Sequence, residues 1–111
     1  MRLGMQYKRG DVLLIKFPFT TLSASKKRPV LVLKSENEHH DFVCFQITSK
    51  STQNHLIRIE KSVLSSGELR LVSFVKYDKC FTLNSKLVDK KLASLHHQFM
   101  DHVKECFCDT I

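Results

Sequence analysis

Residues 10–19 read GDVLLIKFPF, and residues 26–33 read KKRPVLVL. Each segment holds a mostly apolar run of strand length, and glycine and proline, which are typical of turns, bound the first run. The pattern predicts buried strands at residues 12–17 and 30–34, joined by a loop at residues 18–27. A loop of this length in a small domain is more often a binding element than a simple turn. It is rich in hydroxyl groups, at Thr20, Thr21, Ser23 and Ser25.

Three further segments have the apolar, aromatic and β-branched pattern of strands: residues 42–48, 55–60 and 69–75. Gly67 marks a turn before the last of them. Short connections with little helix between the strands favour an antiparallel, meandering sheet that curls into a small barrel. A parallel, doubly wound sheet is disfavoured.

The last quarter of the chain changes to helical periodicity. Asn84 or Ser85 can cap a short helix, and Ser94 can cap a second one. The first helix carries Leu87, Val88 and Leu92. The second has an apolar stripe of Leu95, Phe99, Met100, Val103, Cys106 and Phe107. We therefore expect a mainly β fold with C-terminal helices, in one domain spanning residues 1–111.

Length and composition agree with one compact domain, because the chain has 111 residues of which 42% are hydrophobic. No run approaches the roughly 20 apolar residues of a membrane span, and no apolar signal-peptide segment follows the start, so we expect a cytoplasmic protein. The four cysteines lack C-x-x-C spacing and are expected to be reduced thiols. No metal or cofactor is expected, because the nearby Cys and His residues match zinc-site spacings poorly. These residues are Cys106, Cys108, His96, His97 and His102.

Positive charge is in excess: 18 Lys and Arg residues against 11 Asp and Glu residues give a net charge of +7. Such an excess attracts polyanions. Lys26, Lys27 and Arg28 are adjacent, and the rigid Pro29 precedes the apolar strand. The fork of N–H donors on a guanidinium matches the oxygens of a phosphodiester. The cluster therefore indicates nucleic-acid binding.

Several motifs occur in order along most of the chain: the two opening segments, ITS at residues 47–49, SFVKYDK at residues 73–79 and FTL at residues 81–83. In these motifs the sequence resembles the PemK/MazF-type toxins of bacterial type II toxin-antitoxin systems. The resemblance implies an SH3-like small antiparallel β-barrel, the MazF/PemK/CcdB-like plasmid maintenance toxin fold. It also implies a homodimer that cleaves single-stranded RNA (mRNA) sequence-specifically and without metal, and so inhibits translation and growth.

The implied partner is a cognate antitoxin, whose acidic segment would lie over the cationic active cleft. Operator DNA would be bound only through the antitoxin complex. No membrane partner is implied.

By resemblance, the active arginine and threonine of the family fall on Arg28 and Thr48. Metal-free RNA cleavage requires the 2′-hydroxyl to attack the adjacent phosphorus. Preorganised hydrogen-bond donors must then stabilise the charge that develops on the phosphate oxygens. Arg28 supplies such donors and is a poor general base, because its pKa is very high. Thr48 offers a short, stiff hydroxyl at a strand end, which can hold a phosphate oxygen or orient the 2′-hydroxyl.

The general base is unassigned. Many family members have a glutamate about five residues before the arginine, where this chain has Ser23, and a serine hydroxyl is too weakly basic for that role. Histidine titrates near neutral pH, so His55, His39 and His40 are candidates.

The remaining predicted RNA contacts fall into two groups. Phosphate and backbone contacts are expected from Lys26, Lys27, Lys50, Lys76, Ser23, Ser25, Ser49 and His55. Base stacking and base-edge recognition are expected from Phe19, Gln46, Gln53, Asn54 and Tyr77.

Two alternatives stay open. A noncatalytic protein on the same barrel, such as a toxin that inhibits DNA gyrase, would leave RNA intact, because a fold does not determine its chemistry. An inactive family member would keep RNA or partner binding without cleavage.

Overall fold

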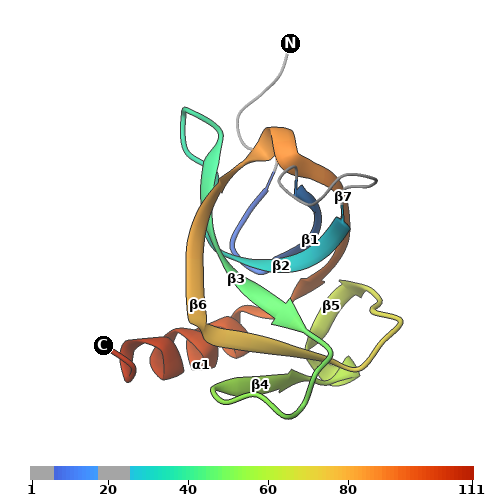
Figure 1. Ribbon diagram of the computed structural model, residues 1–111, viewed down its shortest axis with the longest axis vertical. Helices are drawn as coiled ribbons and strands as arrows, with labels where there is room; N and C mark the ends of the chain where they lie inside the picture. The colour runs from blue at the N-terminus through green and yellow to red at the C-terminus, as the bar shows by residue number, and fades with distance from the viewer. Residues whose placement is uncertain (1–6, 18–25) are drawn as a thin grey trace.

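The computed structural model describes residues 7–17 and 26–111, in which seven strands form one sheet in the order β4-β6-β3-β2-β1-β7-β5. All pairings are antiparallel, and the sheet curls into an open barrel with a single helix packed outside it (Figure 1). The strands are β1 Asp11–Phe17, β2 Lys26–Lys34, β3 Asp41–Thr48, β4 Leu56–Ile59, β5 Leu64–Gly67, β6 Ser73–Asn84 and β7 Val88–Leu95. Two 3₁₀ turns, η1 Lys61–Val63 and η2 Ser85–Leu87, precede β5 and β7, and the helix α1 is His97–Cys108.

The first three predicted strands are confirmed as β1, β2 and β3, and the fourth as β4. Their apolar runs are nearly continuous because both faces of the sheet are covered here. β2 begins at Lys26, four residues earlier than predicted, so that Arg28 lies in a strand opposite Ile15 of β1. The part of the predicted loop at residues 18–25 lies outside the described residues.

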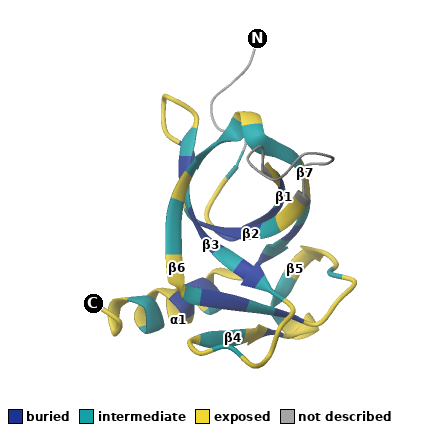
Figure 2. Cartoon of the chain, in the orientation of Figure 1, coloured by how far each residue is buried: buried dark blue, intermediate teal, exposed yellow. Residues whose placement is uncertain are grey.

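Alternate residues of these strands enter two cores, one on each face of the sheet. One face carries Val12 and Phe45 and is covered by α1, whose Phe107 ring meets that of Phe45 edge to face at 5.3 Å. The opposite face lines the inside of the curl and includes Leu13 and Cys44. Figure 2 shows buried residues along β2, β3 and the start of β6. Burial raises the pKa of the Cys44 thiol to about 12, which suits a side chain that acts as part of the core.

The predicted strand at residues 69–75 is wrong over most of its length. Residues 68–72 form a connection, and β6 begins at Ser73 and continues to Asn84. β6 has an irregularity at residues 77–79, where the register with β3 shifts, and the strand bends there (Figure 1). Because of the bend, residues 73–76 of β6 pair with β4, while residues 80–84 follow the curled part of the sheet beside β3.

β5 was not predicted, because Gly67 indicated a turn. Gly67 instead ends a strand that lies very close to β7: a Cβ atom at this position would be 2.7 Å from Ala93 Cα and closer still to the Leu92 carbonyl oxygen. Its φ of +75° is also in the left-handed region that favours glycine. The glycine therefore permits a strand contact.

We expect Gly67→Ala to lower the free energy of unfolding by more than the roughly 1–2 kcal/mol that the left-handed conformation alone costs a residue with a Cβ. The added methyl group would also push β5 away from β7. Urea denaturation followed by circular dichroism measures the loss, with the exposed neighbour Ser65→Ala as the control. Equal midpoints for the two variants would contradict this close packing.

The predicted helix after Asn84 is also wrong, so the fold has one C-terminal helix rather than helices. The Asn84 side chain does cap a turn, accepting from the Lys86 amide, but the turn is only η2. The chain continues as β7, because pairing with β1 and β5 and burial of Ala93 and Leu95 outweigh local helix preference. Within the part of the chain that the structure describes, no helix has the length and apolar character needed to span a membrane.

The second predicted helix is confirmed as α1, with Met100 and Val103 buried. Its N-cap residue is His96, and Leu95 belongs to β7. Ser94 is not the cap: its hydroxyl donates to the carboxylate of the buried Asp11 at 3.0 Å and ties β7 to the start of β1.

Candidate functional site

A pocket of about 230 Å³ opens where β2 and β3 separate. The ladder between these strands ends at Val30 and Gln46, next to Pro29, which has no N–H to donate. The same register extended by two residues places Arg28 opposite Thr48. The pocket is lined by Arg28, Pro29, Gln46, Ile47, Thr48, Ser49, Lys50, Leu71 and Ser73.

Arg28 and Thr48, predicted from separate motifs, thus line the same pocket. Arg28 is exposed, and within residues 7–17 and 26–111 no ion pair engages its guanidinium. Thr48 is half-buried, and its Oγ1 accepts from the Lys50 amide at 3.1 Å. This bond fixes the hydroxyl at the strand end and leaves its proton to donate. The pair can therefore present donors to one anionic group.

Ser49 and Lys50 are exposed at the pocket rim, and Gln46 reaches it from β3. Lys27 lies next to the pocket but outside its lining, and its Nζ is 3.2 Å from Asp89 Oδ2. The hydrogen bond from Lys27 lowers the pKa of Asp89. Asp89 also lies 3.7 Å from Lys16 Nζ, so one carboxylate partly neutralises two strand lysines.

Four predicted contacts cannot be placed. Ser23, Ser25 and Phe19 lie outside the described residues, and of Lys26 only the backbone is described.

Lys76 does not line the pocket, although it pairs with Gln46, which does. Its side chain is 10% exposed, and its Nζ donates to Asp78 Oδ1 and to the Asn54 carbonyl, each at 2.8 Å. The hydrogen bond from Lys76 lowers the pKa of Asp78. This ammonium is engaged within the protein.

None of the three candidate histidines lines the pocket. His55 lies beside Tyr77 of β6, with ring centroids 5.5 Å apart, whereas Thr48 pairs with Phe74. Tyr77 and Phe74 are three strand residues apart, so His55 lies about 10 Å along β6 from Thr48.

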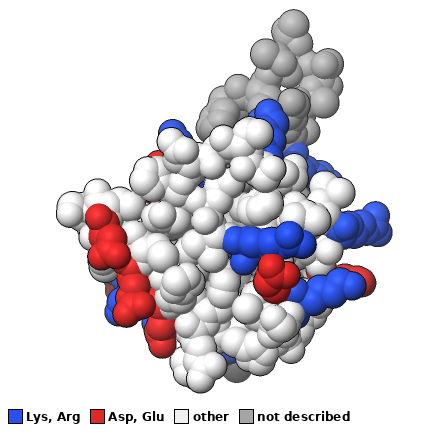
Figure 3. All heavy atoms as spheres, turned by 90° about the horizontal axis from the view of Figure 1, so that it is seen from below, with Lys and Arg blue, Asp and Glu red and all other residues white. Residues whose placement is uncertain are grey.

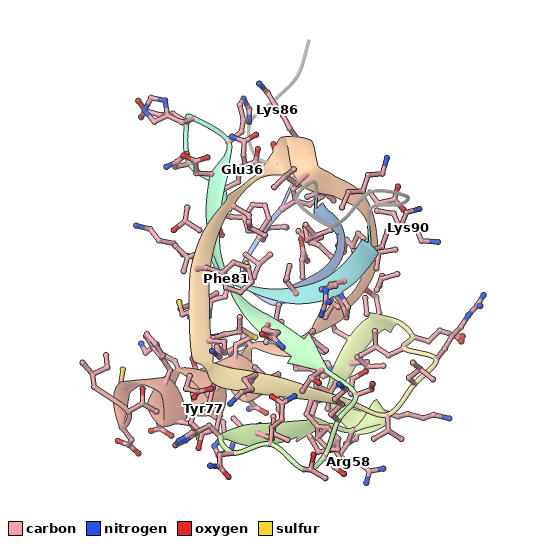
Figure 4. The ribbon with its side chains drawn as sticks, viewed as in Figure 1. Glu36, Arg58, Tyr77, Phe81, Lys86 and Lys90 are labelled. Carbon is pink, nitrogen blue, oxygen red and sulfur yellow. The ribbon has the colours of Figure 1, made fainter. Side chains whose placement is uncertain are left out.

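His39 and His40 belong to the turn after β2, at least six residues or about 20 Å along the strand from Arg28. His40 Nδ1 lies 2.6 Å from the buried Glu36 carboxylate. Figure 4 shows Glu36 at the opposite end of the molecule from Arg58 and Tyr77.

Among the described residues, the lining thus holds donors but neither imidazole nor carboxylate. Over the described ranges no cluster of His, Cys, Asp and Glu could hold a metal ion. The arrangement can bind a phosphate and stabilise charge on its oxygens.

Sequence reasoning missed Leu71 and Ser73, because the pattern of residues 69–75 predicts one strand. Leu71 and Val72 are 69% and 53% exposed, and the Ser73 hydroxyl donates to the Leu71 carbonyl at 2.9 Å, which shapes this connection. Residues 69–75 carry the apolar pattern of a strand, so no signal in the sequence marks Leu71 and Ser73 as pocket residues.

The same connection joins the pocket to a second hollow of about 530 Å³. The two share Pro29, Leu71 and Ser73. The second hollow adds three cationic residues and one acidic residue to the lining: Arg70, Lys90, Lys91 and Glu68. Seen from below, Asp and Glu gather on the side where α1 lies, while Lys and Arg, with some acidic side chains among them, lie toward the β5 side (Figure 3). A polyanion leaving the pocket would therefore meet basic side chains.

Comparison with known proteins gives a family and a fold. The family model for PemK-like, MazF-like toxins of type II toxin-antitoxin systems matches residues 8–111. A search of curated protein sequences gives no match.

The fold is similar to that of three solved structures. An endoribonuclease in complex with its cognate antitoxin, from a mycobacterial species, has a TM-score of 0.71 at 16% identity, covering 94% of this chain and 93% of that chain. A mycobacterial endoribonuclease has a TM-score of 0.68 at 18% identity, covering 93% and 88%. MazF from Deinococcus radiodurans has a TM-score of 0.67 at 17% identity, covering 94% of both chains.

Proposed function

Because the chain belongs to the PemK-like, MazF-like toxins of type II toxin-antitoxin systems, we propose that it is an endoribonuclease that cleaves single-stranded RNA without a metal ion. The observation that carries the proposal is the presence of Arg28 and Thr48 in the lining of one pocket. The endoribonuclease structures with the same fold support it. The substrate is mRNA in the cytoplasm, and its loss stops translation and growth.

In the proposed reaction the 2′-oxygen forms a bond to the adjacent phosphorus, and the bond to the 5′-oxygen of the next nucleotide breaks. The 2′-hydroxyl gives up its proton to solvent and the leaving 5′-oxygen takes one from solvent, so the products are a 2′,3′-cyclic phosphate and a 5′-hydroxyl. Arg28 donates to the nonbridging oxygens as their charge grows, because a guanidinium presents two parallel N–H groups. Thr48 donates to the same phosphate or orients the 2′-hydroxyl.

Lys50, Ser49 and Gln46 position the RNA around this phosphate, and the hollow with Arg70, Lys90 and Lys91 receives the adjoining backbone. Ser23 and Ser25, which lie in the sequence between β1 and β2, and Lys26, the first residue of β2, are proposed to contact RNA. Phosphate contacts of this kind set register and orientation rather than sequence. Recognition of bases falls to residues beside them, such as Gln46.

The proposed partner is an antitoxin with an acidic segment that covers the cationic pocket. The net charge of +7 and the mycobacterial relative solved with its cognate antitoxin support this partner. The toxin acts as a homodimer in this proposal, and operator DNA is contacted through the antitoxin complex.

The test is to incubate the purified protein with a long RNA in EDTA and to map the new 5′ ends. We expect cleavage to persist in EDTA, because the pocket supplies its positive charge through Arg28 and Lys50. The cuts should fall at a limited set of sequences and leave 5′-hydroxyl ends. The same mapping identifies the preferred sequence. Intact RNA with a folded wild-type protein would overturn the proposal, and inhibition of gyrase supercoiling in that case would support the noncatalytic alternative.

A further inference from the structure

A connection crosses the sheet beside the proposed active site. β6 lies between β3 and β4 and is antiparallel to both, so β3 and β4 run in the same direction. The chain from Thr48 to Leu56 must therefore pass over β6 (Figure 1). We call residues 49–55 the crossover segment. It begins with Ser49 and Lys50, which line the pocket.

Lys76 holds the far end of the crossover segment. It occupies the point of β6 that pairs with Gln46 on one side and Leu56 on the other. Its Nζ donates to the Asn54 carbonyl at 2.8 Å, and Asp78 Oδ1 accepts from the same ammonium at 2.8 Å. Bonds to a charged donor are about twice as strong as neutral ones.

The neighbouring residues reinforce this attachment. The Tyr77 amide donates to the His55 carbonyl at 3.1 Å, and the two rings meet edge to face at 5.5 Å. At the near end, Thr48 Oγ1 accepts from the Lys50 amide at 3.1 Å. The crossover segment is thus bonded at both ends, with Lys76 as its one charged donor among these contacts. Figure 4 shows Tyr77 on β6 close to this region.

These contacts leave Lys76 poorly suited to bind RNA directly. An ammonium has three N–H donors, and two of them are engaged here. The side chain is 10% exposed, so a phosphate would have to displace its partners.

We propose that Lys76 is a positioning residue that holds the crossover segment, so that Ser49 and Lys50 stay at the pocket and RNA binds there without touching Lys76. The proposal rests on the proposed RNA cleavage. Asp78 holds the ammonium in place, because its Oδ1 lies 2.8 Å from Lys76 Nζ.

The first measurement needs no RNA. Lys76→Met keeps the length of the side chain and removes its charge, and Asp78→Asn removes the carboxylate and keeps the ammonium. We expect both variants to show faster amide hydrogen exchange and shifted NMR signals in residues 49–55, with strands β1 and β2 unchanged. Lys104→Met, on the exposed face of α1, is the matched control. Unchanged exchange in the crossover segment of both Lys76→Met and Asp78→Asn would overturn the proposal.

The second measurement separates positioning from direct contact. Losing one phosphate contact to single-stranded nucleic acid lowers the salt slope of log K by about 0.7. We expect Lys50→Ala to show this drop with a fully 2′-O-methylated RNA, which lacks the nucleophile. Lys76→Met should also bind more weakly, and because Lys50 then loses its place, its slope should fall by no more than that of Lys50→Ala; adding Lys76→Met to Lys50→Ala should lower the slope no further. For unmodified RNA, kcat/KM of Lys76→Met should fall about 10- to 100-fold, because small misplacements are that costly. Lys76→Arg, which keeps the charged donor, should recover part of the loss.

Asp78→Asn gives opposite expectations for the two roles. A lysine that contacts phosphate would be released by this change and bind RNA more tightly, whereas a positioning lysine loses its support and binding weakens. Asp109→Asn, on the exposed end of the chain, controls for the change in net charge. Tighter binding of Asp78→Asn than of Asp109→Asn, or a further drop in the salt slope when Lys76→Met is added to Lys50→Ala, would overturn the proposal. If wild-type protein neither cleaves nor binds RNA, the proposed function fails, while the amide exchange still decides whether Lys76 holds the crossover segment.

Discussion

Replacing Arg28 with alanine is expected to lower RNA cleavage by about 10²- to 10³-fold, the usual effect of removing one donor that meets transition-state charge. Arg28 is exposed and outside the cores, so the unfolding midpoint should stay close to that of wild type. Thr48→Ala should also lose most of the cleavage. Single-turnover cleavage of a short RNA with the mapped site measures both.

Two controls sharpen this result. Arg28→Lys keeps the charge but not the fork of donors, so its activity should lie between those of wild type and Arg28→Ala. Lys34→Ala removes an exposed cation at the other end of the same strand and should leave cleavage within a few-fold of wild type. Near-normal cleavage by Arg28→Ala would mean that the reaction takes place elsewhere.

Replacing Phe45 with alanine is expected to cost about 3–5 kcal/mol of folding free energy, as large-to-small changes of buried aromatic residues do. Phe45 is fully buried, lies on the face that α1 covers, and meets the Phe107 ring at 5.3 Å. Because a domain is stabilised by only about 5–15 kcal/mol, this loss is a large share of the total. Chemical denaturation followed by circular dichroism gives the value.

The contact with Phe107 can be isolated in a double-mutant cycle. Phe107→Ala should cost less than Phe45→Ala, because Phe107 is only half-buried. The coupling between the two changes should be about 0.5–1.5 kcal/mol, the usual excess for an aromatic pair. A coupling of zero would show that α1 does not depend on this ring contact.

Apolar patterning was a reliable guide where one segment carries its own signal. The runs in β1, β2 and β3 are strongly apolar and bounded by turn residues, and the stripe of α1 contains its buried Met100 and Val103. Apolar patterning was unreliable where pairing with a strand distant in the sequence determines the local structure. Residues 88–95 have local features of a helix, yet β1 and β5 on either side make them a strand.

The residues of the candidate site also fall into those that the sequence could identify and those that it could not. Arg28 and Thr48 could be selected from their motifs and from the chemistry of a guanidinium and a hydroxyl. Leu71 and Ser73 could not, because residues 68–72 have an apolar pattern but no strand partner in the described chain. The sequence predicts Lys76 as a phosphate contact, and only its partners Asn54 and Asp78 identify it as a buried support.

By itself, the sequence determined the family, the mainly β class, the cationic segment at residues 26–28 and the two residue types suited to a phosphate, because these depend on composition, local period and motif. Only the tertiary structure decided that Arg28 and Thr48 share a pocket, that β5 and β7 complete the sheet, and that the ammonium of Lys76 turns inward. The physical reason is that strand pairing joins residues far apart in the chain, and that burial decides which charges stay available to a ligand.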